Sequence, residues 1–382
     1  MRDAFPDPWL RLYSLKANGL PPLVAEIAAA GGFLASAVSR GEIGLATRAG
    51  LAPARIVLEG IGKTDADLSL AATLARRGTP LTWVSLESEE DAAALARAAA
   101  GGPRIDVLVR VNPRVAPETY AALAVGASAS KFGVVPEEIN AVIQAGGGAR
   151  GPLRWRGIHL HIGSQLGAID AWRAAARIGL RLVRLQRASL RDFDTIDFGG
   201  GFPVAYELGA ESVPAIAHFA GALREELAAL PDDARPARVA VEPGRAVVAA
   251  SGWLVARVLH VRRREPAIVV LDAGMTELVR PAMYGALHPI ISLTSLGGTR
   301  MTETTSMAAV RVDGAICEST DSFGPATLPP LERGDVVALG VAGAYTSSMF
   351  SSYNGRPRPS EVAWDGERLL TWRRRGSLRT LP

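Results

Sequence analysis

The chain has 382 residues and a formal net charge of +4, with 48% apolar and 21% charged residues, a composition typical of globular proteins. Its arginine runs, Arg262–Arg264 and Arg373–Arg375, contain no aromatic residue that could stack on a base, so we expect no nucleic-acid partner. The single cysteine, Cys317, excludes an intrachain disulfide framework, and there is no apolar leader or apolar run of about 18 residues, so we expect a cytoplasmic protein without a membrane partner.

Short apolar runs alternate with helix-period segments from the start of the chain to about residue 242. The expected strands cover residues 11–15, 34–38, 55–58, 81–85, 105–111, 155–161, 193–198 and 237–242. The expected helices cover residues 20–31, 64–77, 88–100, 168–189 and 212–229. This alternation indicates parallel strands joined by crossover helices, and eight strands favour an α/β fold with a closed (β/α)8 TIM barrel over an open sheet.

The character of the sequence changes after Pro243-Gly244. Segments 246–260, 266–272, 307–312 and 335–341 are rich in β-branched and apolar residues, with Gly, Pro and Asp between them. We therefore expect a barrel domain over residues 1–248 and a C-terminal antiparallel β domain, a sandwich or small barrel, over residues 249–382.

Lys16 follows the apolar run 12–15, which places it at the C-terminal end of the first expected strand, where (β/α)8 barrels carry their chemistry. The chain contains only three lysines, Lys16, Lys63 and Lys131, against a large excess of arginine. Because a desolvated lysine can act as a nucleophile and arginine cannot, Lys16 is a candidate catalytic amine. The alternative is a surface lysine just past a strand.

Two histidines, His159 and His161, lie on one face of the strand 155–161 and precede a Gly-Ser turn. No other His or Cys in the sequence has the spacing of a further metal ligand, so we expect no metal. An imidazole that packs flat on a cofactor ring is the better functional interpretation of His161, whereas His159 fits a satisfied structural histidine better.

Two further motifs follow strand ends. Gly199-Gly200-Gly201 offers backbone N–H groups to an anion such as a phosphate, although glycine runs also form plain turns. Glu242 ends the last barrel strand, where a buried carboxylate needs a cation, either a protonated pyridine nitrogen or an arginine. Together with Lys16 and His161, these motifs describe a site for pyridoxal 5′-phosphate (PLP).

The chain resembles the PLP-dependent decarboxylases of fold type III, and most closely their diaminopimelate decarboxylase branch. The motifs that carry the resemblance follow one another in order from residue 13 to about residue 362. They are Tyr13 to Asn18, Glu59 to Thr64, Ser130 to Gly133, His159 to Gln165, Asp197 to Pro203, Glu242 to Arg245, Asp272 to Met275, Arg280 to Gly285, Ile316 to Asp321, Gly343 to Tyr345 and Ser352 to Pro357. The resemblance implies a barrel followed by a β domain, as in alanine racemase.

The resemblance also implies a role for each matched position. Lys16 would bond to PLP, His161 would stack on its ring, Glu242 would pair with the ring nitrogen, and Cys317 would protonate the carbanion left by decarboxylation. The other cofactor contacts would come from Ser164, Gly199, Gly200, Gly201, Gly244, Arg245 and Tyr345. Substrate contacts would come from Arg245, Arg280, Tyr284, Glu318 and Tyr345. Cys317 and Glu318 would enter the site from the partner subunit of a homodimer.

Three features depart from the pattern of this family. The strand and helix that normally precede the lysine strand are not in the sequence, so we expect either a shortened start or a β domain that lacks an edge. Ser36 stands where the family has an acid. Thr320 stands where the family has glycine, near Glu318, the expected reader of the substrate amino group.

The reaction that the resemblance implies is the decarboxylation of meso-diaminopimelate to L-lysine and CO2 in lysine biosynthesis. The alternatives are a related decarboxylase of another or a conjugated amino acid in a specialised pathway, an amino-acid racemase, and a PLP-binding protein without catalysis. Cys317, in the polar sequence Cys-Glu-Ser-Thr-Asp, argues against the racemase, and the expected β domain argues against the non-catalytic protein.

Overall fold

The computed structural model describes residues 1–119, 126, 130–206, 213–293 and 307–380, and the chain divides into two compact units. The first unit consists of Met1–Pro203 and Ser212–Val247, and the second of Val204–Glu211 and Val248–Pro382. The second unit therefore includes a short segment, Val204–Glu211, that no sequence signal separated from the barrel.

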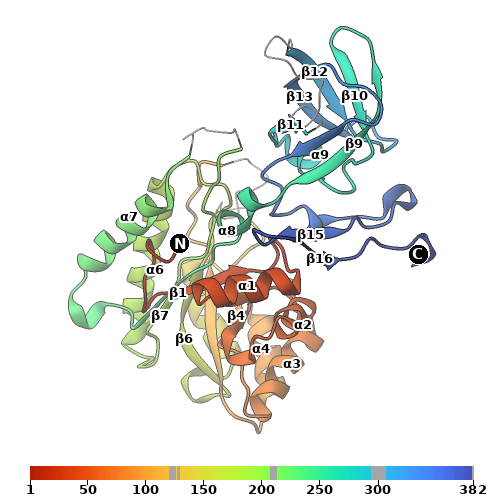
Figure 1. The fold of residues 1–382 in the computed structure, drawn as a ribbon. Coiled ribbons are helices and arrows are strands. Elements are labelled where there is room, and N and C mark those ends of the chain that lie inside the picture. Colours follow the sequence, from red (N-terminus) through yellow and green to blue (C-terminus); the bar gives the residue numbers. More distant parts are fainter. Residues whose placement is uncertain (120–125, 127–129, 207–212, 294–306, 381–382) are drawn as a thin grey trace. The chain divides into compact units, whose positions relative to one another are not determined.

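Eight parallel strands among the described residues close a barrel in the first unit, in the order β1 to β8 (Figure 1). The strands are β1 (Leu10–Ser14), β2 (Leu34–Ala37), β3 (Ile56–Leu58), β4 (Trp83–Leu86), β5 (Ile105–Val111), β6 (Leu153–Leu160), β7 (Thr195–Asp197) and β8 (Arg238–Val241). β1 pairs with β8, with Leu10 opposite Ala240, and this pairing closes the ring. The expected TIM barrel is confirmed, and the ends of its strands lie within two residues of their expected positions.

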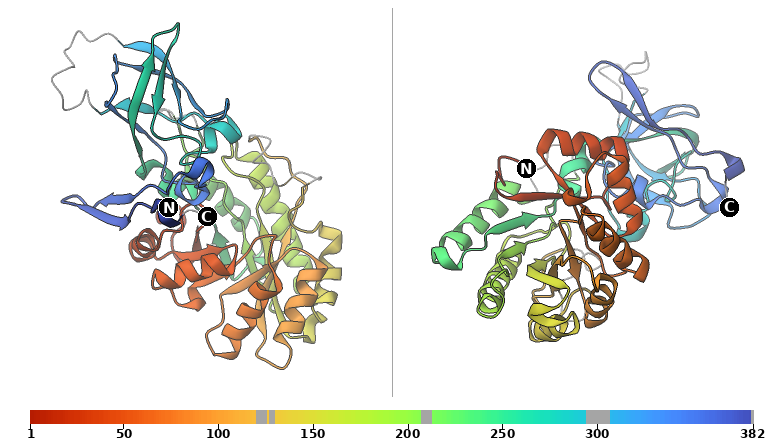
Figure 2. Two further views of the ribbon diagram at one scale, coloured as in Figure 1. Left: turned by 90° about the vertical axis from the view of Figure 1, so that its right-hand side faces the viewer. Right: turned by 90° about the horizontal axis from the view of Figure 1, so that it is seen from below.

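Helices surround the outside of the barrel (Figure 2). They are α1 (Pro21–Gly31), α2 (Arg40–Arg48), α3 (Asp65–Arg76), α4 (Glu89–Ala99), α5 (Ile139–Ala145), α6 (Asp170–Arg187) and α7 (Ile216–Ala228). α2 and α5 were not expected, and residue 212, the expected start of α7, lies outside the described residues. The side chains of Ser39, Thr64 and Ser88 cap α2, α3 and α4 by accepting backbone N–H bonds, which fixes where these helices begin.

The interior of the barrel contains one apolar cluster and, at or just past the strand ends, several buried ionisable side chains. Leu12, Val57, Trp83, Leu108 and Ala240 form a fully buried apolar cluster. Strands of a parallel barrel are buried on both faces and normally read as continuous apolar runs, so ionisable side chains inside the barrel need an explanation. The barrel contains several such side chains at or just past the strand ends, and they belong to the site described below.

The second unit contains a six-stranded sheet in the order β11-β14-β9-β10-β12-β13 and a hairpin, β15-β16. Its elements are β9 (Leu254–Arg262), β10 (Ala267–Leu271), α9 (Arg280–Tyr284), β11 (Ile290–Ser292), β12 (Ala308–Asp313), β13 (Ser322–Leu328), β14 (Val336–Leu339), β15 (Glu361–Trp364) and β16 (Leu369–Arg373). Adjacent strands are antiparallel except for β10 and β12, which are parallel. Apolar side chains from β9, β10, β12, β13 and β14 form the core of this unit.

One expected strand of the β domain begins too early. Residues 246–248 belong to a short helix, α8 (Arg245–Val248), in which the Val247 N–H donates to the Gly244 carbonyl oxygen at 3.0 Å. The strand β9 begins only at Leu254. The apolar run 246–260 therefore contains a helical turn and a strand, and apolar composition alone does not distinguish them over so few residues.

Candidate active site

The C-terminal ends of four barrel strands bring together most of the residues that the sequence singled out. Lys16 lies two positions after β1, His161 follows β6 directly, and Glu242 follows β8 directly. The glycine run 199–201 comes just after β7. Strand ends of this kind meet at one end of a closed parallel barrel, which is where (β/α)8 enzymes place their active sites.

The segments that carry Lys16 and Glu242 are joined by their backbones. The Ser14 N–H donates to the Pro243 carbonyl oxygen at 3.1 Å, and the Ser14 hydroxyl donates to the Glu242 carbonyl oxygen at 3.2 Å. A Cβ on Gly244 would lie 3.0 Å from the Ser14 Cβ and 3.1 Å from the Ala17 Cβ. Gly244 therefore serves the close packing of the two strand ends around Lys16, which is half-buried.

The ring of His161 is held in one orientation and stays neutral. Its Nδ1 accepts a hydrogen bond from the Gly200 N–H at 3.1 Å, so the neutral ring carries its proton on Nε2. Burial lowers the pKa of His161 well below its ordinary value, and the charges of Lys16 and Arg110 lower it further. His161 is thus an uncharged, oriented imidazole beside Lys16.

The glycine run differs from the expected row of anion-binding amides. The Gly199 N–H donates to Asp197 Oδ1 at 2.9 Å, and the Gly200 N–H donates to His161, so both amides are already engaged. Of the three glycine amides, the Gly201 N–H alone has no acceptor among the residues that the structure describes. The prediction that Gly199 and Gly200 hold an anion through their amides is therefore wrong. Instead, glycine is needed because a Cβ at Gly200 would lie 2.2 Å from the Glu242 carbonyl oxygen.

Aromatic side chains on both sides of the run hold this turn in place. Phe198 and Phe202 each lie 6.1 Å from the Trp172 ring on α6, measured between ring centroids. Phe202 also packs edge-on against Phe219 of α7 at 5.5 Å. Contacts of this geometry stabilise the turn beyond the burial of apolar area, next to the residues that meet His161 and Glu242.

Ser164 and Arg245, both expected at the cofactor, contact each other. The buried Arg245 donates from Nη2 to the Ser164 hydroxyl at 3.0 Å. This bond joins the loop after β6 to the start of α8 and presents a guanidinium and a hydroxyl side by side, a pair suited to an anion such as a phosphate or a carboxylate.

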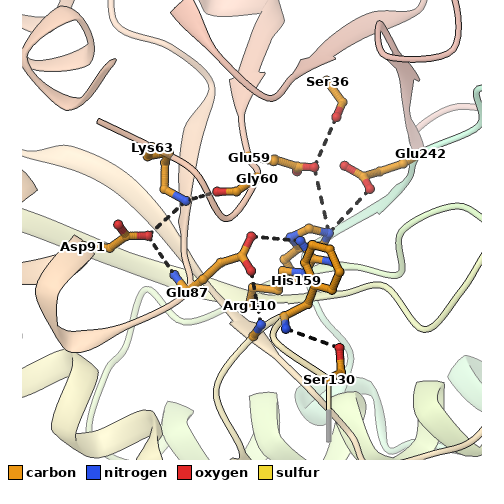
Figure 3. A network of polar contacts seen from close by, with 12 residues as sticks. Ser36, Glu59, Gly60, Lys63, Glu87, Asp91, Arg110, Ser130, His159 and Glu242 are labelled. Atoms are coloured by element: carbon orange, nitrogen blue, oxygen red, sulfur yellow. Dashed lines mark hydrogen bonds and ion pairs between the residues drawn. The ribbon is translucent and has the colours of Figure 1, made fainter. Parts of the chain in front are cut away.

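Glu242 belongs to a buried polar cluster that the sequence did not reveal (Figure 3). His159 Nε2 lies 3.5 Å from Glu242 Oε2 and 3.9 Å from Glu59 Oε2. The Ser36 hydroxyl donates to Glu59 Oε2 at 3.1 Å. Two buried acids therefore face Nε2 of His159, and its interpretation as a structural histidine remains a prediction. Ser36, noted as a departure from the family pattern, thus contacts an acid on the neighbouring strand.

A chain of ion pairs ties the ends of β3, β4 and β5 beside this cluster (Figure 3). Lys63 contacts the Gly60 carbonyl oxygen and pairs with Asp91 at 3.1 Å. Glu87 pairs with Arg110 at 2.8 Å inside the barrel. Burial opposes ionisation of Glu87, but the charges of Arg110 and Lys63 hold its pKa below the ordinary value, so this pair remains charged.

The other expected residues lie in the second unit. The Arg280 guanidinium is buried, 5.4 Å from the ring centroid of Tyr206 and 5.6 Å from that of Tyr284. Cys317 is an exposed free thiol, and the adjacent Glu318 accepts a hydrogen bond from the Tyr353 hydroxyl at 2.6 Å. Tyr345 adopts a φ of 57°, in the left-handed region.

The loop that carries Cys317 and Glu318 is fixed by a buried acid, Asp321. Its carboxylate accepts the Met275 N–H and the Ile316 N–H, each at 2.6 Å. These two hydrogen bonds fix the backbone of the loop that carries the Cys317 thiol and the Glu318 carboxylate.

Among the described residues, Glu59, His159 and Glu242 form a group that could hold a metal ion, with their ligand atoms within 4.8 Å of one another. The absence of a metal remains a prediction. None of the helices that the structure describes has the length and apolar character of a membrane-crossing segment.

Known proteins with similar sequences indicate the family to which this site belongs. A family model described as "Pyridoxal-dependent decarboxylase, pyridoxal binding domain" matches residues 1–249. Diaminopimelate decarboxylase of Deinococcus radiodurans is 35% identical over 365 residues, which cover 95% of this chain and 86% of that protein. The diaminopimelate decarboxylase of Helicobacter pylori strain J99 is 32% identical over 373 residues, covering 97% of this chain and 87% of that protein.

A solved structure of a protein with the same name is similar to the chain over almost its whole length. The crystal structure of diaminopimelate decarboxylase from Helicobacter pylori complexed with L-lysine matches with a TM-score of 0.88 and 30% sequence identity. The match covers 99% of this chain and 90% of that chain.

Proposed function

Because the chain belongs to the family of pyridoxal-dependent decarboxylases, we propose that it converts meso-diaminopimelate to L-lysine and CO2 with PLP as its cofactor. A related decarboxylase of another or a conjugated amino acid is the nearest alternative. We further propose a cytoplasmic location, in keeping with the free thiol of Cys317.

The observation that carries this proposal is the unpaired oxygen of Glu242. Its side chain is buried, and Oε1 has no hydrogen-bond partner among the described residues. A buried carboxylate oxygen is costly unless it meets a donor or a cation, and the protonated ring nitrogen of PLP is both. Lys16 and His161 follow the C-terminal ends of β1 and β6 at the same end of the barrel, as an amine and a flat neutral ring suited to the same cofactor. The residues present therefore fit PLP.

We assign the cofactor contacts as follows. Lys16 would bond to the cofactor aldehyde, His161 would pack against the ring, and Glu242 would bind the ring nitrogen. The Gly201 amide, the Ser164 hydroxyl and Tyr345 would bind the phosphate, and the Arg245 guanidinium donates to Ser164. Gly199, Gly200 and Gly244 contribute by allowing the close approach of the strand ends.

When bound, PLP supplies an electron-withdrawing ring that accepts the electron pair released as CO2 leaves. Glu242, held as a carboxylate, keeps the ring nitrogen protonated and the ring a strong acceptor. His161 stays neutral, so it covers the ring without adding a competing positive charge. The Cys317 thiol would donate a proton to the substrate carbon as the general acid.

The substrate contacts follow from charge. We propose that Arg245 and Arg280 bind a carboxylate at the far end of the substrate, and that Tyr284 and Tyr345 also contact the substrate. Glu318 binds the second amino group, and its hydrogen bond from Tyr353 orients the carboxylate for this purpose. An amino acid with a second charged head, such as diaminopimelate, fits this set.

We also propose a homodimer in which Cys317 and Glu318 serve the site of the partner subunit. Both side chains are exposed, and the hairpin β15-β16 exposes Val362 (56%), Trp364 (63%) and Leu369 (67%), which suits a surface that is covered on association. Mixing the Lys16→Ala and Cys317→Ala variants tests this arrangement. Shared sites would restore up to about a quarter of the wild-type activity, since half of the dimers would hold one intact site. No recovery on mixing would contradict shared sites.

The decisive experiment is CO2 release from purified protein with PLP, comparing meso-diaminopimelate with lysine, ornithine, arginine and glutamate. We expect release from meso-diaminopimelate alone. CO2 release from a different amino acid would support decarboxylation as the reaction but contradict meso-diaminopimelate as the substrate. Racemisation without CO2 release would contradict the proposal.

A further inference from the structure

Glu59, His159 and Glu242, here called the buried cluster, bring two carboxyl groups and an imidazole together inside the barrel. Their relative exposures are 3%, 1% and 4%, and their ligand atoms lie within 4.8 Å of one another. His159 stands between the two acids, 3.5 Å from Glu242 Oε2 and 3.9 Å from Glu59 Oε2 (Figure 3).

The charges around the buried cluster do not balance. Asp197, with 0% exposure, adds a third carboxyl group, and the nearby Arg110 is already paired with Glu87 at 2.8 Å. His161, which also faces Glu242, is neutral. Buried carboxylates this close cannot all be ionised, so the cluster holds at least one proton.

The hydrogen bonds indicate where that proton resides. The Ser36 hydroxyl donates to Glu59 Oε2, whereas Glu59 Oε1 has no partner among the described residues and is the atom left to carry a proton. Two carboxylates can only accept, so a proton on one of them is needed for a bond between them. Burial and the charge of Glu242 raise the pKa of Glu59 well above its ordinary value. Burial by itself would also raise the pKa of Glu242, but His159 and the Glu59 acid outweigh it and hold that pKa well below the ordinary value.

We propose that Glu59 is a positioning residue that keeps a proton and donates it in a hydrogen bond to Glu242, so that Glu242 remains the ionised partner of the cofactor ring nitrogen. His159 orients the Glu242 carboxylate from β6, and Ser36 orients Glu59 from β2. The inference rests on the proposed function only for the identity of the cofactor. The proton itself is a property of the chain without any ligand.

The first test is infrared spectroscopy of the full-length protein freed of PLP, at neutral pH. We expect a carbonyl band of a protonated carboxylic acid that disappears in Glu59→Gln, which keeps the size of the side chain but cannot hold the proton as an acid. Asp67→Asn is the matched control, because Asp67 is a buried acid of the same unit that caps α3 and lies outside the cluster. The band is expected to remain in this control. A band that persists in Glu59→Gln and disappears in Asp197→Asn would assign the proton to Asp197 and overturn the proposal.

The second test is the dissociation constant for PLP, measured by absorbance titration. Glu59→Gln retains an N–H donor toward Glu242, so we expect binding within about threefold of wild type, whereas Glu59→Ala loses the donor and weakens binding about tenfold or more. Equal affinity of Glu59→Ala and wild type would overturn the positioning role. Circular dichroism establishes that each variant is folded, and the infrared arm with Glu59→Gln does not depend on Glu59→Ala.

Two further outcomes separate this inference from its alternatives. One equivalent of a divalent metal, released by a chelator with a change in the infrared band, would show that the cluster is a metal site and would overturn the proposal. Loss of the acid band in Glu59→Gln together with no CO2 release from any amino acid would support the proton on Glu59 and contradict the proposed function.

Discussion

Lys16 is the residue whose substitution has the most direct expected effect on the covalent binding of PLP. It is half-buried at the end of β1, beside the neutral ring of His161. In Lys16→Ala we expect the visible absorbance of bound PLP to disappear, and borohydride to fix no cofactor to the chain, because the covalent link is lost while the non-covalent contacts remain. Lys131→Ala, at an exposed lysine, is the control and should behave as wild type. A borohydride-stable label in Lys16→Ala would move the nucleophile to another residue.

Lys16, His161 and Glu242 could be predicted because each ends an apolar run, and the ends of parallel strands meet at one end of a barrel. Glu59 also follows a strand, β3, but its role depends on His159 and Glu242, which reach it from β6 and β8. Nothing in the sequence around Glu59 specifies which strands face it across a closed barrel. The two acids that face His159 could not be predicted for the same reason, since they meet it only in the assembled barrel.

The turn between β7 and α7 depends on glycine for space. A Cβ at Gly200 would lie 2.2 Å from the Glu242 carbonyl oxygen, so Gly200→Ala forces the ends of β7 and β8 apart. We expect a loss of about 1–3 kcal/mol in the free energy of unfolding and weaker PLP binding. Gly221→Ala is the control: it lies in α7, and its Cβ would meet nothing within 4 Å. Alanine there should stabilise the helix by about 0.5–1 kcal/mol. Denaturant unfolding with a PLP titration measures both effects, and equal stability of the two variants would contradict the steric argument.

The loop between β12 and β13 depends on Asp321. Its carboxylate accepts two backbone N–H bonds of 2.6 Å, from Met275 and Ile316. Burial raises the pKa of Asp321 and offsets part of this gain, so we expect Asp321→Ala to cost about 2 kcal/mol of stability. CO2 release should fall as well, because Cys317 and Glu318 lie on this loop.

Asp313→Ala is the matched control, since Asp313 pairs with the half-exposed Arg311 at 2.7 Å. A pair of this kind contributes less than about 1 kcal/mol. Full activity in Asp321→Ala would show that the loop needs no anchor.

The elements that the sequence missed share a physical reason. α2 contains Gly41 and Gly44, which lower helix propensity, and its position is fixed by the Ser39 cap and by packing. β13 contains Gly324 and Pro325, which disfavour a strand, yet it pairs with β12 along its length. In both cases tertiary contacts override local preference, whereas long periodic segments such as α6 were predicted correctly.

At the scale of the whole molecule, the buried acids give stability a characteristic pH dependence. Burial, together with the charge of Glu242, raises the pKa of Glu59 and of Asp197 well above the ordinary carboxyl range. The folded protein without PLP therefore binds more protons than the unfolded chain between the ordinary and the raised pKa. The stability that these groups contribute is fully present below the ordinary pKa and is lost as the pH rises through the raised one.

Glu59→Gln removes one of these groups without changing the size of the side chain. We expect the stability of Glu59→Gln relative to wild type to increase with pH across this window, by up to about 1.4 kcal/mol per pH unit. For Asp67→Asn we expect the difference in stability from wild type to change with pH for the opposite reason, because the pKa of Asp67 is lowered. Burial raises the pKa of Asp67, but the hydrogen bonds from Thr64 and Arg40 outweigh it and lower that pKa, so wild type should lose its advantage over Asp67→Asn as the pH falls. Urea unfolding of PLP-free protein at several pH values from about 3 to 8 measures both differences, the Asp67 effect below the ordinary carboxyl pKa and the Glu59 effect above it. A Glu59→Gln difference that does not change with pH would mean that Glu59 is ionised in the folded barrel, and the cluster would then need a cation to balance its charge.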